Sequence, residues 1–251
     1  MPRMHAIVVA ALAAGSAFGQ VTTIDFSTED DGITPLVNGQ QIDDEFGFIF
    51  NLSSFGGSNS GIAVFDTGLP SPNQGGGDGD LLVGLGNALI LQNNGGSFQT
   101  QTTPGVFDTP NDDPSGGTIR FDFTLEVELL EITLIDIDNS AATLVTLTDS
   151  SGNTRVYDVP DNWTFDVDNT PDGFDVLDLT TLASQQGEAG GIATASQDAG
   201  FDATRVVRLD VALSGSGAID NLVINGTDIP APGGAAALGL GGLLATRRRR
   251  G

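Results

Sequence analysis

The chain has 251 residues, no cysteine and one histidine, and its 39% of hydrophobic residues indicates a folded rather than a disordered protein. All 33 acidic residues lie between residues 20 and 228, where they face four arginines and no lysine, so this stretch carries a net charge of −29. Such a charge excludes a nucleic-acid-binding role and attracts divalent cations, while about 209 residues suit one domain of the larger all-β kind.

Residues 1–19 have the three parts of a secretory signal peptide. Arg3 is the positive start, Ala6–Ala14 is the apolar centre, and Ala17-Phe18-Gly19 is a small-x-small cleavage site. We expect cleavage after Gly19, and the alternative is a buried N-terminal helix. No cysteine follows the cleavage site, so a lipoprotein anchor is excluded.

Strand-type alternation of apolar and polar residues runs through residues 20–228, and helical periodicity is nearly absent. In Thr118–Leu125 the residues Ile119, Phe121, Phe123 and Leu125 fall on one face, and Thr204–Leu213 alternates in the same way. The other predicted strands are Ala88–Gln92, Ile132–Ile137, Thr143–Thr148, Thr154–Val159 and Ala218–Ile224, and Thr180–Ser184 is predicted as one helical turn. Many short strands between polar, Gly-rich turns predict an all-β fold, an antiparallel β-sandwich of jelly-roll type.

A short internal repeat occurs within this domain. Val64-Phe65-Asp66-Thr67 recurs as Val106-Phe107-Asp108-Thr109, and each copy precedes a loop that contains proline and acidic residues. Four matching residues are too few for a solenoid. We expect the loops that follow the two copies to be similar and to lie at one end of the sandwich.

Calcium is the ligand that the acidic residues suit best, because it binds six to eight oxygen atoms from carboxylates, carbonyls and water. In carbohydrate-binding jelly rolls, one carboxylate on the first strand and one on the last share a structural calcium, and Asp25 and Asp220 match that placement. A second candidate site is formed by loop acids: Asp66, Asp78, Asp80, Asp112 and Asp113. The alternative is that all of these are solvated acids on a very acidic surface.

The sequence offers little for catalysis. The histidine is His5, inside the predicted signal peptide, so nucleophile systems based on histidine or cysteine and the common zinc sites are excluded from the exported chain. Two carboxylates suffice for glycoside hydrolysis, but such sites need aromatic platforms, and besides phenylalanines the exported chain has only Trp163 and Tyr157. We therefore expect a non-enzymatic protein, with a carboxylate-based glycosidase as the less favoured alternative.

Trp163 lies in the polar stretch Pro160-Asp161-Asn162-Trp163-Thr164. An exposed indole there would stack on a sugar ring, which would make the domain a carbohydrate-binding module. The other interpretation, which we favour, is that Trp163 covers the core beneath the loop.

Residues 229–251 consist of a short motif, an apolar run and a basic cluster. The apolar run, Gly233–Thr246, is shorter than the ~20 residues of a stable membrane span, and arginines after such a run hold the tail on the cytoplasmic side. The motif and the cluster comprise Pro230, Ala231, Pro232, Gly233, Arg247, Arg248, Arg249 and Arg250. This order resembles the PEP-CTERM sorting signal, with alanine at position 231 where that family usually has glutamate.

The PEP-CTERM resemblance implies a route and a partner. In that family the tail holds the exported protein in the inner membrane until an exosortase, a membrane-embedded cysteine transpeptidase, cuts at the motif. The protein then passes to the cell surface or the extracellular matrix. For this chain the resemblance implies secretion, transient inner-membrane anchoring through the tail alone, and an exosortase-type processing enzyme.

The domain at residues 20–228 also resembles a group of exported bacterial β-sandwich domains that often carry such tails. Four stretches carry this resemblance: Ile24-Asp25-Phe26, Gly76–Leu81 after the first VFDT copy, Asp112–Ile119 and Gly217–Leu222. Gly79 stands where these relatives usually have proline. The resemblance implies a surface or matrix protein, and we expect calcium and exopolysaccharide as its binding partners.

Overall fold

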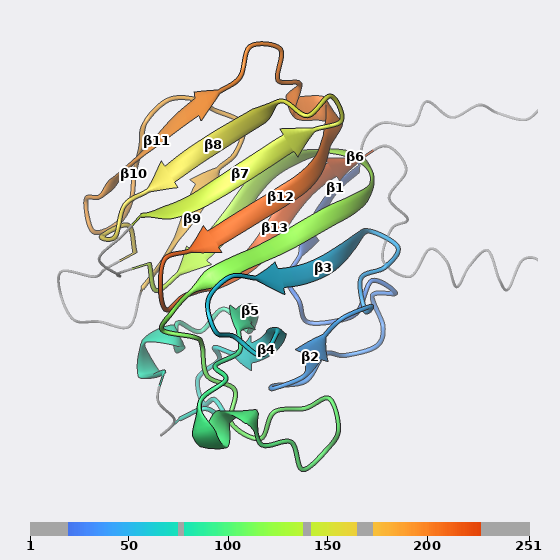
Figure 1. The fold of residues 1–251 in the computed structure, drawn as a ribbon, viewed down its shortest axis with the longest axis vertical. Helices are drawn as coiled ribbons and strands as arrows, with labels where there is room; N and C mark the ends of the chain where they lie inside the picture. Colours follow the sequence, from blue (N-terminus) through green and yellow to red (C-terminus); the bar gives the residue numbers. More distant parts are fainter. Residues whose placement is uncertain (1–19, 75–77, 138–141, 165–172, 227–251) are drawn as a thin grey trace, which may run out of the picture.

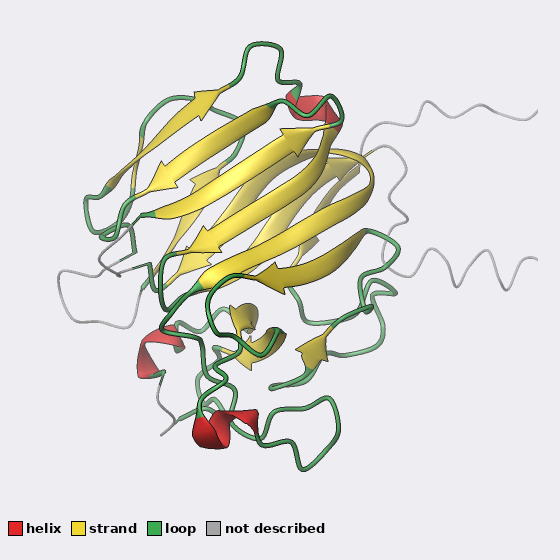
Figure 2. Ribbon diagram, in the orientation of Figure 1, coloured by secondary structure: helices red, strands yellow, loops and turns green. Residues whose placement is uncertain are grey.

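The structure is a computed structural model that describes residues 20–74, 78–137, 142–164 and 173–226. This part of the chain is rich in β-strands, contains three 3-10 turns and has no α-helix, so the predicted all-β class is confirmed (Figure 2). The predicted signal peptide and the C-terminal tail with its apolar helix lie outside the described residues.

The described residues form thirteen strands and three 3-10 turns. The strands are β1 Gln20–Ile24, β2 Gln41–Ile42, β3 Phe50–Phe55, β4 Ile62–Asp66, β5 Asn87–Leu91, β6 Gly117–Ile135, β7 Thr143–Asp149, β8 Thr154–Val159, β9 Phe174–Asp178, β10 Gln185–Gln186, β11 Ile192–Gln197, β12 Val206–Leu213 and β13 Ala218–Gly226. The 3-10 turns are η1 Gly79–Leu81, η2 Gly96–Gln99 and η3 Ala203–Arg205.

Every strand pairing in the sheet is antiparallel. The order is β10-β11-β8-β7-β12-β6-β13-β5-β4-β2, with β1 added on β13 and with β3 and β9 added on β6. Figure 1 shows β9, β13 and β1 behind the part formed by β7, β8 and β12, with β4 and β5 at the lower end. The first and the last strands of the described chain are thus direct neighbours.

The long strand β6 connects two parts of the sheet, one that contains β12 and β3 and one that contains β13 and β9. Its first half pairs with β12 and β3, and its second half pairs with β13 and β9. Alternating burial is interrupted between these halves, where Thr124, Leu125 and Glu126 are all exposed. The expectation of two separate strands, Thr118–Leu125 and Ile132–Ile137, is therefore wrong, and so is the inward placement of Leu125.

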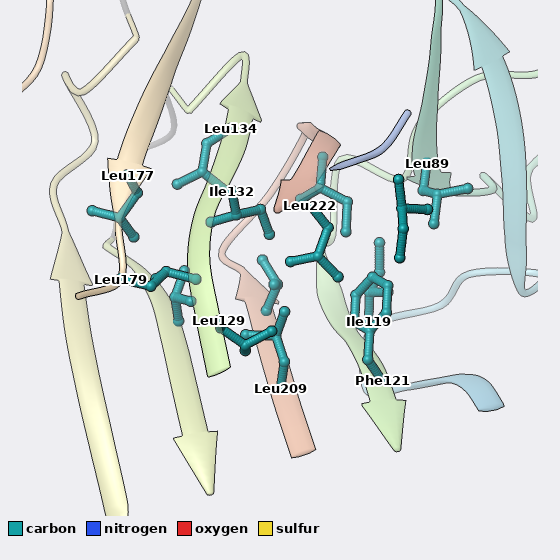
Figure 3. Packing of buried hydrophobic residues seen from close by; sticks show 14 of the residues in the cluster. Leu89, Ile119, Phe121, Leu129, Ile132, Leu134, Leu177, Leu179, Leu209 and Leu222 are labelled. Atoms are coloured by element: carbon teal, nitrogen blue, oxygen red, sulfur yellow. The ribbon is translucent and has the colours of Figure 1, made fainter. Parts of the chain in front are cut away.

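One hydrophobic cluster contains residues from both parts of the sheet. It includes Phe121 of β6, Leu147 of β7 and Leu209 of β12 together with Leu177 of β9 and Leu222 of β13. Figure 3 shows such side chains gathered between the strands. Strand β7 buries one set of alternate residues, as the period of two in the sequence requires.

A second cluster covers the opposite face of the sheet where β4 and β5 meet β13. It includes Phe65, Ile90, Phe107 and Ala218. At this end both faces of β13 are covered by protein, which explains how a polar residue of this strand becomes buried.

The two copies of the VFDT repeat lie beside each other but differ in structure. Val64 and Phe65 belong to β4, whereas Phe107 lies in a loop. The loop after the first copy contains η1, and the loop after the second leads to β6 without a 3-10 turn, so the expectation of two similar loops is wrong. Gly39 joins the copies, because its N–H donates to Val64 O at 2.8 Å and its carbonyl accepts from Phe107 N–H at 2.7 Å. Both phenylalanines pack into the second cluster.

The helical turn predicted at Thr180–Ser184 does not form. These residues follow β9 as bends and irregular backbone. The Asp178 carboxylate accepts hydrogen bonds from the N–H of Thr180 at 2.7 Å and from its hydroxyl at 2.6 Å. A side chain that binds the backbone two residues ahead stabilises a turn in competition with a helix.

Candidate functional site: buried carboxylates

Asp25 and Asp220 are brought close together by the pairing of β1 with β13. Ile24 pairs with Leu222, so Asp25 follows the last paired residue of β1 and lies near the bulge between Asp220 and Val223. The two carboxylates repel each other electrostatically. The structure thus places the first-strand and last-strand acids next to each other, as the jelly-roll comparison implies.

The Asp220 carboxyl is completely buried. It lies two residues after Ala218, on the face of β13 that the second cluster covers. Its oxygens accept hydrogen bonds from the N–H and the side-chain amide of Asn221, at 2.7 and 2.9 Å. Burial raises the pKa of Asp220 to about 7, with a further contribution from the negative charge of Asp25.

Asp78 and Asp112 form the second group of carboxylates. The N–H of Asp112 donates to Asp78 Oδ2 at 3.0 Å, and the side-chain amide of Asn111 donates to Asp78 Oδ1 at 2.5 Å. Asp80, in η1, adds its charge to both acids. The loop before η1 and the loop before β6 therefore meet at these carboxylates.

Asp112 is connected in turn to the start of β13 and the end of β6. Its Oδ2 atom accepts from Gly217 N–H at 2.6 Å and from the Ser216 hydroxyl at 2.5 Å. The same hydroxyl lies 3.1 Å from Oδ2 of Asp136, directly after β6. We call Asp78, Asp80, Asp112 and Asp136 the carboxylate cluster.

Two members of the carboxylate cluster are deeply buried: Asp112 is 4% exposed and Asp136 is 5% exposed. Burial raises the pKa of Asp78 to about 7, assisted by the charges of Asp112 and Asp80. Burial also raises the pKa of Asp112, and the charge of Asp80 adds to that effect. The folded chain therefore disfavours the simultaneous ionisation of Asp78 and Asp112 unless a positive charge compensates them.

The arginines of the described residues contact other groups. Arg120, Arg205 and Arg208 form ion pairs with acids elsewhere: Asp210 at 2.6 Å, Glu126 at 2.9 Å and Asp122 at 2.7 Å, respectively. Arg155 donates to Gln197 Oε1 and Leu179 O, at 3.0 and 2.9 Å. Each of these four arginines therefore has a described partner outside the carboxylate cluster.

Two of the predicted loop acids, Asp66 and Asp113, accept hydrogen bonds from residues outside the carboxylate cluster. Asp66, at the end of β4, accepts from Gly68 N–H at 2.8 Å. Asp113 is buried, but its oxygens accept from Ser115 N–H at 2.8 Å and from the Ser58 hydroxyl at 3.4 Å. Of the five acids predicted for the loop site, the described contacts therefore link Asp78, Asp80 and Asp112.

A further acidic group lies on the surface. Asp43, Asp44 and Glu45 bring one carboxylate oxygen each within 4.8 Å of one another, and no other trio among the described residues does so. Both aspartates are exposed, so water solvates their charges without a metal ion. A metal ion at the carboxylate cluster would need carbonyl or water ligands in addition to the acids.

Trp163 is buried, with 1% of its surface exposed. Its indole lies against Gly187, where an added Cβ would come within 2.8 Å of the ring. No hydrogen-bond partner for Nε1 exists in the described chain. Because neither face of the indole is open, the geometry favours the interpretation of Trp163 as a core residue over that of a sugar platform.

No family model, no curated protein and no solved structure matches this chain. Within the described ranges, no helix has the length and hydropathy needed to cross a membrane. The sorting residues Pro230 to Gly233 and Arg247 to Arg250 lie outside these ranges.

Three participants in the carboxylate cluster were not predicted from the sequence: Asp136, Asn111 and Ser216. Asp136 follows directly after the apolar run at the end of β6. An acid between a strand and a turn only weakly indicates a site. Its positive φ of 57° was a conformational signal that only the structure supplies. Ser216 lies in a Ser/Gly turn that resembles any other turn in sequence.

Proposed function

We propose that the chain is an exported, non-enzymatic β-sandwich protein of the cell surface or extracellular matrix, whose fold is stabilised by bound calcium. The observation that carries this proposal is the carboxylate cluster, in which acids from three parts of the chain meet and two of them, Asp112 and Asp136, are buried. A divalent cation would balance their charge, and oxygen atoms are the ligands that calcium prefers.

The two-layer jelly-roll arrangement is part of this proposal. Support comes from β6, whose halves pair with different strands, and from the hydrophobic cluster that both parts of the sheet share. A strand that passes from one sheet to the other is common at the corners of such folds. The adjacency of β1 and β13 agrees with a jelly roll as well.

Secretion and sorting are supported by the sequence at both ends of the domain. Residues 1–19 have the three parts of a signal peptide, and residues 229–251 have the motif, apolar run and arginine cluster of the sorting signal. In this proposal an exosortase-type enzyme acts on the tail, and calcium links the acidic surface to anionic exopolysaccharide. Replacement of Arg247 to Arg250 by glutamine should then reduce the membrane-held precursor, as measured by cell fractionation.

Calcium binding is tested by isothermal titration calorimetry of the purified full-length chain and of Asp112→Asn. We expect calcium to bind the wild type and to bind the variant at least tenfold more weakly, because each buried carboxylate oxygen contributes a charged ligand. The exposed Asp158, which belongs to β8, provides the matched control Asp158→Asn. Equal affinity in Asp112→Asn and Asp158→Asn would contradict a site at the cluster.

A further inference from the structure

The outer face of the layer formed by β3, β6, β12 and β7 is open to solvent. The first half of β6 pairs with β3 on one side and with β12 on the other, and β12 pairs with β7. Figure 1 shows this layer on the near side of the molecule, and no described segment crosses it there. Residues that alternate with the buried core residues of these strands point outward. We call the outward residues within 51–55, 118–122, 144–148 and 208–212 the open face.

Two ion pairs of opposite direction lie side by side on the open face. Arg120 of β6 pairs with Asp210 of β12 at 2.6 Å. Two residues farther along β6 the order is reversed, and Asp122 pairs with Arg208 of β12 at 2.7 Å. The open face therefore has no net charge, whereas residues 20–228 together carry −29. Two copies of the chain that meet here avoid the repulsion of the acidic remainder of the surface.

The guanidinium of Arg120 is held in place and can bind a second carboxylate. Its Nε and Nη2 atoms donate to Asp210 Oδ1 and Oδ2 at 2.6 and 2.9 Å, and its Cζ atom lies 4.6 Å from the centre of the Phe55 ring. A guanidinium carries five N–H donors, which is more than one aspartate uses. Because the group is already positioned, a further contact costs little side-chain entropy.

The strand registers make the charges of the open face complementary to those of a second copy. A two-fold axis in the interface, parallel to the strands and between β6 and β12, places β6 of one copy over β12 of the other. Residues that pair across these strands lie on one row of the sheet. Arg120 therefore faces Asp210 of the second copy. On the next row, Arg208 faces Asp122 of the second copy.

The apolar residues of the open face follow the same symmetry. Phe55 of β3 is 46% exposed, and Leu144 of β7 is 41% exposed. Both lie on the row of Thr118 and Ala212, one strand outside β6 and β12, respectively. The same axis places β3 over β7, so Phe55 faces Leu144 of the second copy, and this contact occurs twice. Burial of these side chains removes apolar surface from water.

We propose that the open face is a homodimer interface, in which two copies of the chain pack face to face about this axis. Four strands about 4.8 Å apart and about 20 Å long cover roughly 400 Å² per copy, which is typical of weak complexes. Twisted sheets pack at about 30° to each other, so the ion pairs nearest the axis make the closest contacts. The protein supplies both signs of charge, so the dimer is reversible and forms without calcium.

Sedimentation velocity of the full-length chain, in chelator and in calcium, tests this interface at about 1 µM to 1 mM protein. We expect a monomer–dimer equilibrium in both solutions and at least about tenfold weaker association in Leu144→Ser. The matched control is Ile192→Ser, because Ile192 is 57% exposed and belongs to β11, outside the four strands. A monomer at every concentration, association that requires calcium, or equal losses in the two variants would each overturn the proposal.

A charge exchange tests the direction of the ion pairs. One variant combines Arg120→Asp with Asp210→Arg and Asp122→Arg with Arg208→Asp. It retains the net charge and the cross-strand pairs of opposite charges, so its thermal unfolding midpoint should match that of the wild type. Its self-association should also match that of the wild type, because opposite charges still meet across the axis. Loss of self-association in the folded variant would contradict the proposed axis.

Mixing the variant with the wild type separates this interface from any other route of association. In a mixed dimer, like charges would meet at each of these contacts, so the two chains should not associate with each other. The chain has no lysine, so an amine-reactive dye labels the N-terminus alone. Labelled wild type should therefore dimerise with an excess of unlabelled wild type and stay monomeric with an excess of the variant. Mixed dimers as stable as the wild-type dimer would overturn the proposal.

Discussion

Asp112 links the other members of the carboxylate cluster to the start of β13. Its carboxyl is buried, contacts the start of β13 and lies next to Asp78, whose pKa burial and like charge raise to about 7. Removal of a charge at this position therefore has two opposite effects. It relieves repulsion in the absence of calcium and removes a ligand in its presence.

The raised pKa of Asp78 predicts that the free energy of unfolding depends on pH when a chelator is present. The unfolded chain releases this proton near pH 4, whereas the folded chain retains it up to about pH 7. The stabilisation is thus complete below pH 4 and is lost as the pH rises through 7. Urea unfolding in chelator should show lower stability at pH 8 than at pH 5.

The variant Asp112→Asn serves as the control for this pH dependence. It removes the charge next to Asp78, so the decrease in stability between pH 5 and pH 8 should become smaller. An unchanged decrease would assign the pH effect to groups outside the carboxylate cluster, such as the buried Asp220, whose pKa is also raised to about 7.

Burial of Trp163 predicts a structural role for this side chain. Trp163→Ala should lower the free energy of unfolding by about 3–5 kcal/mol, as expected for a large aromatic residue in a core. Thermal unfolding measures this loss. Because the chain has one tryptophan, its fluorescence also reports on sugars, and a saturable change on addition of polysaccharide would favour the carbohydrate-binding interpretation.

At the scale of elements, β6 determines how the two parts of the sheet are related. Leu129 of its second half is 2% exposed, whereas Leu125, at the change of partners, is 45% exposed. Leu129→Ala should cost about 2–5 kcal/mol, and Leu125→Ala should stay within about 0.5 kcal/mol. Comparable costs for the two variants, measured by urea unfolding, would contradict the described path of β6.

Gly39 is essential for the contact between β4 and the loop at Phe107. It has a φ of +81°, and an added Cβ would lie 2.1 Å from Phe107 O. Gly39→Ala should therefore destabilise the domain by more than about 1 kcal/mol. Gly79→Ala, where an added Cβ meets nothing within 4 Å, is the matched control for the same thermal unfolding measurement.

Alternation in the sequence predicts the central strands well. Thr143–Thr148 and Thr154–Val159 occur almost unchanged as β7 and β8, because each has one buried and one open face. Strand β4 was missed because both of its faces are covered, so Ile62 to Phe65 are all buried and do not alternate. The short β2 and β10 gain their pairing from tertiary contacts, which local patterns do not contain.

The candidate site was predictable in part. The adjacency of Asp25 and Asp220 follows from the neighbouring first and last strands, and the acid-rich loops indicated Asp78 and Asp112. The separation of Asp66 from this group was not predictable, since its carboxylate forms a local turn with Gly68. Asp136 joins through Ser216 across 80 residues of sequence, and no local pattern reports such a contact.

At the scale of the whole molecule, a net charge of −29 between residues 20 and 228 destabilises the folded state through self-repulsion. Any salt reduces this repulsion, because exposed charges are screened over roughly 10 Å at 0.1 M ionic strength. Calcium in the carboxylate cluster would act differently, since it binds a defined group of buried oxygens. Selectivity among ions at equal ionic strength therefore separates the two effects.

The most direct test is the unfolding temperature of the full-length chain in chelator, in millimolar calcium and in magnesium at matched ionic strength. Calcium at ~100 times its dissociation constant adds ~2.7 kcal/mol, and each kcal/mol raises the midpoint by ~2–4 °C in a domain of this size. We predict a rise of several degrees that is specific to calcium and is lost in Asp112→Asn. Equal rises in calcium and magnesium, or an undiminished calcium effect in Asp112→Asn, would contradict calcium stabilisation through the carboxylate cluster.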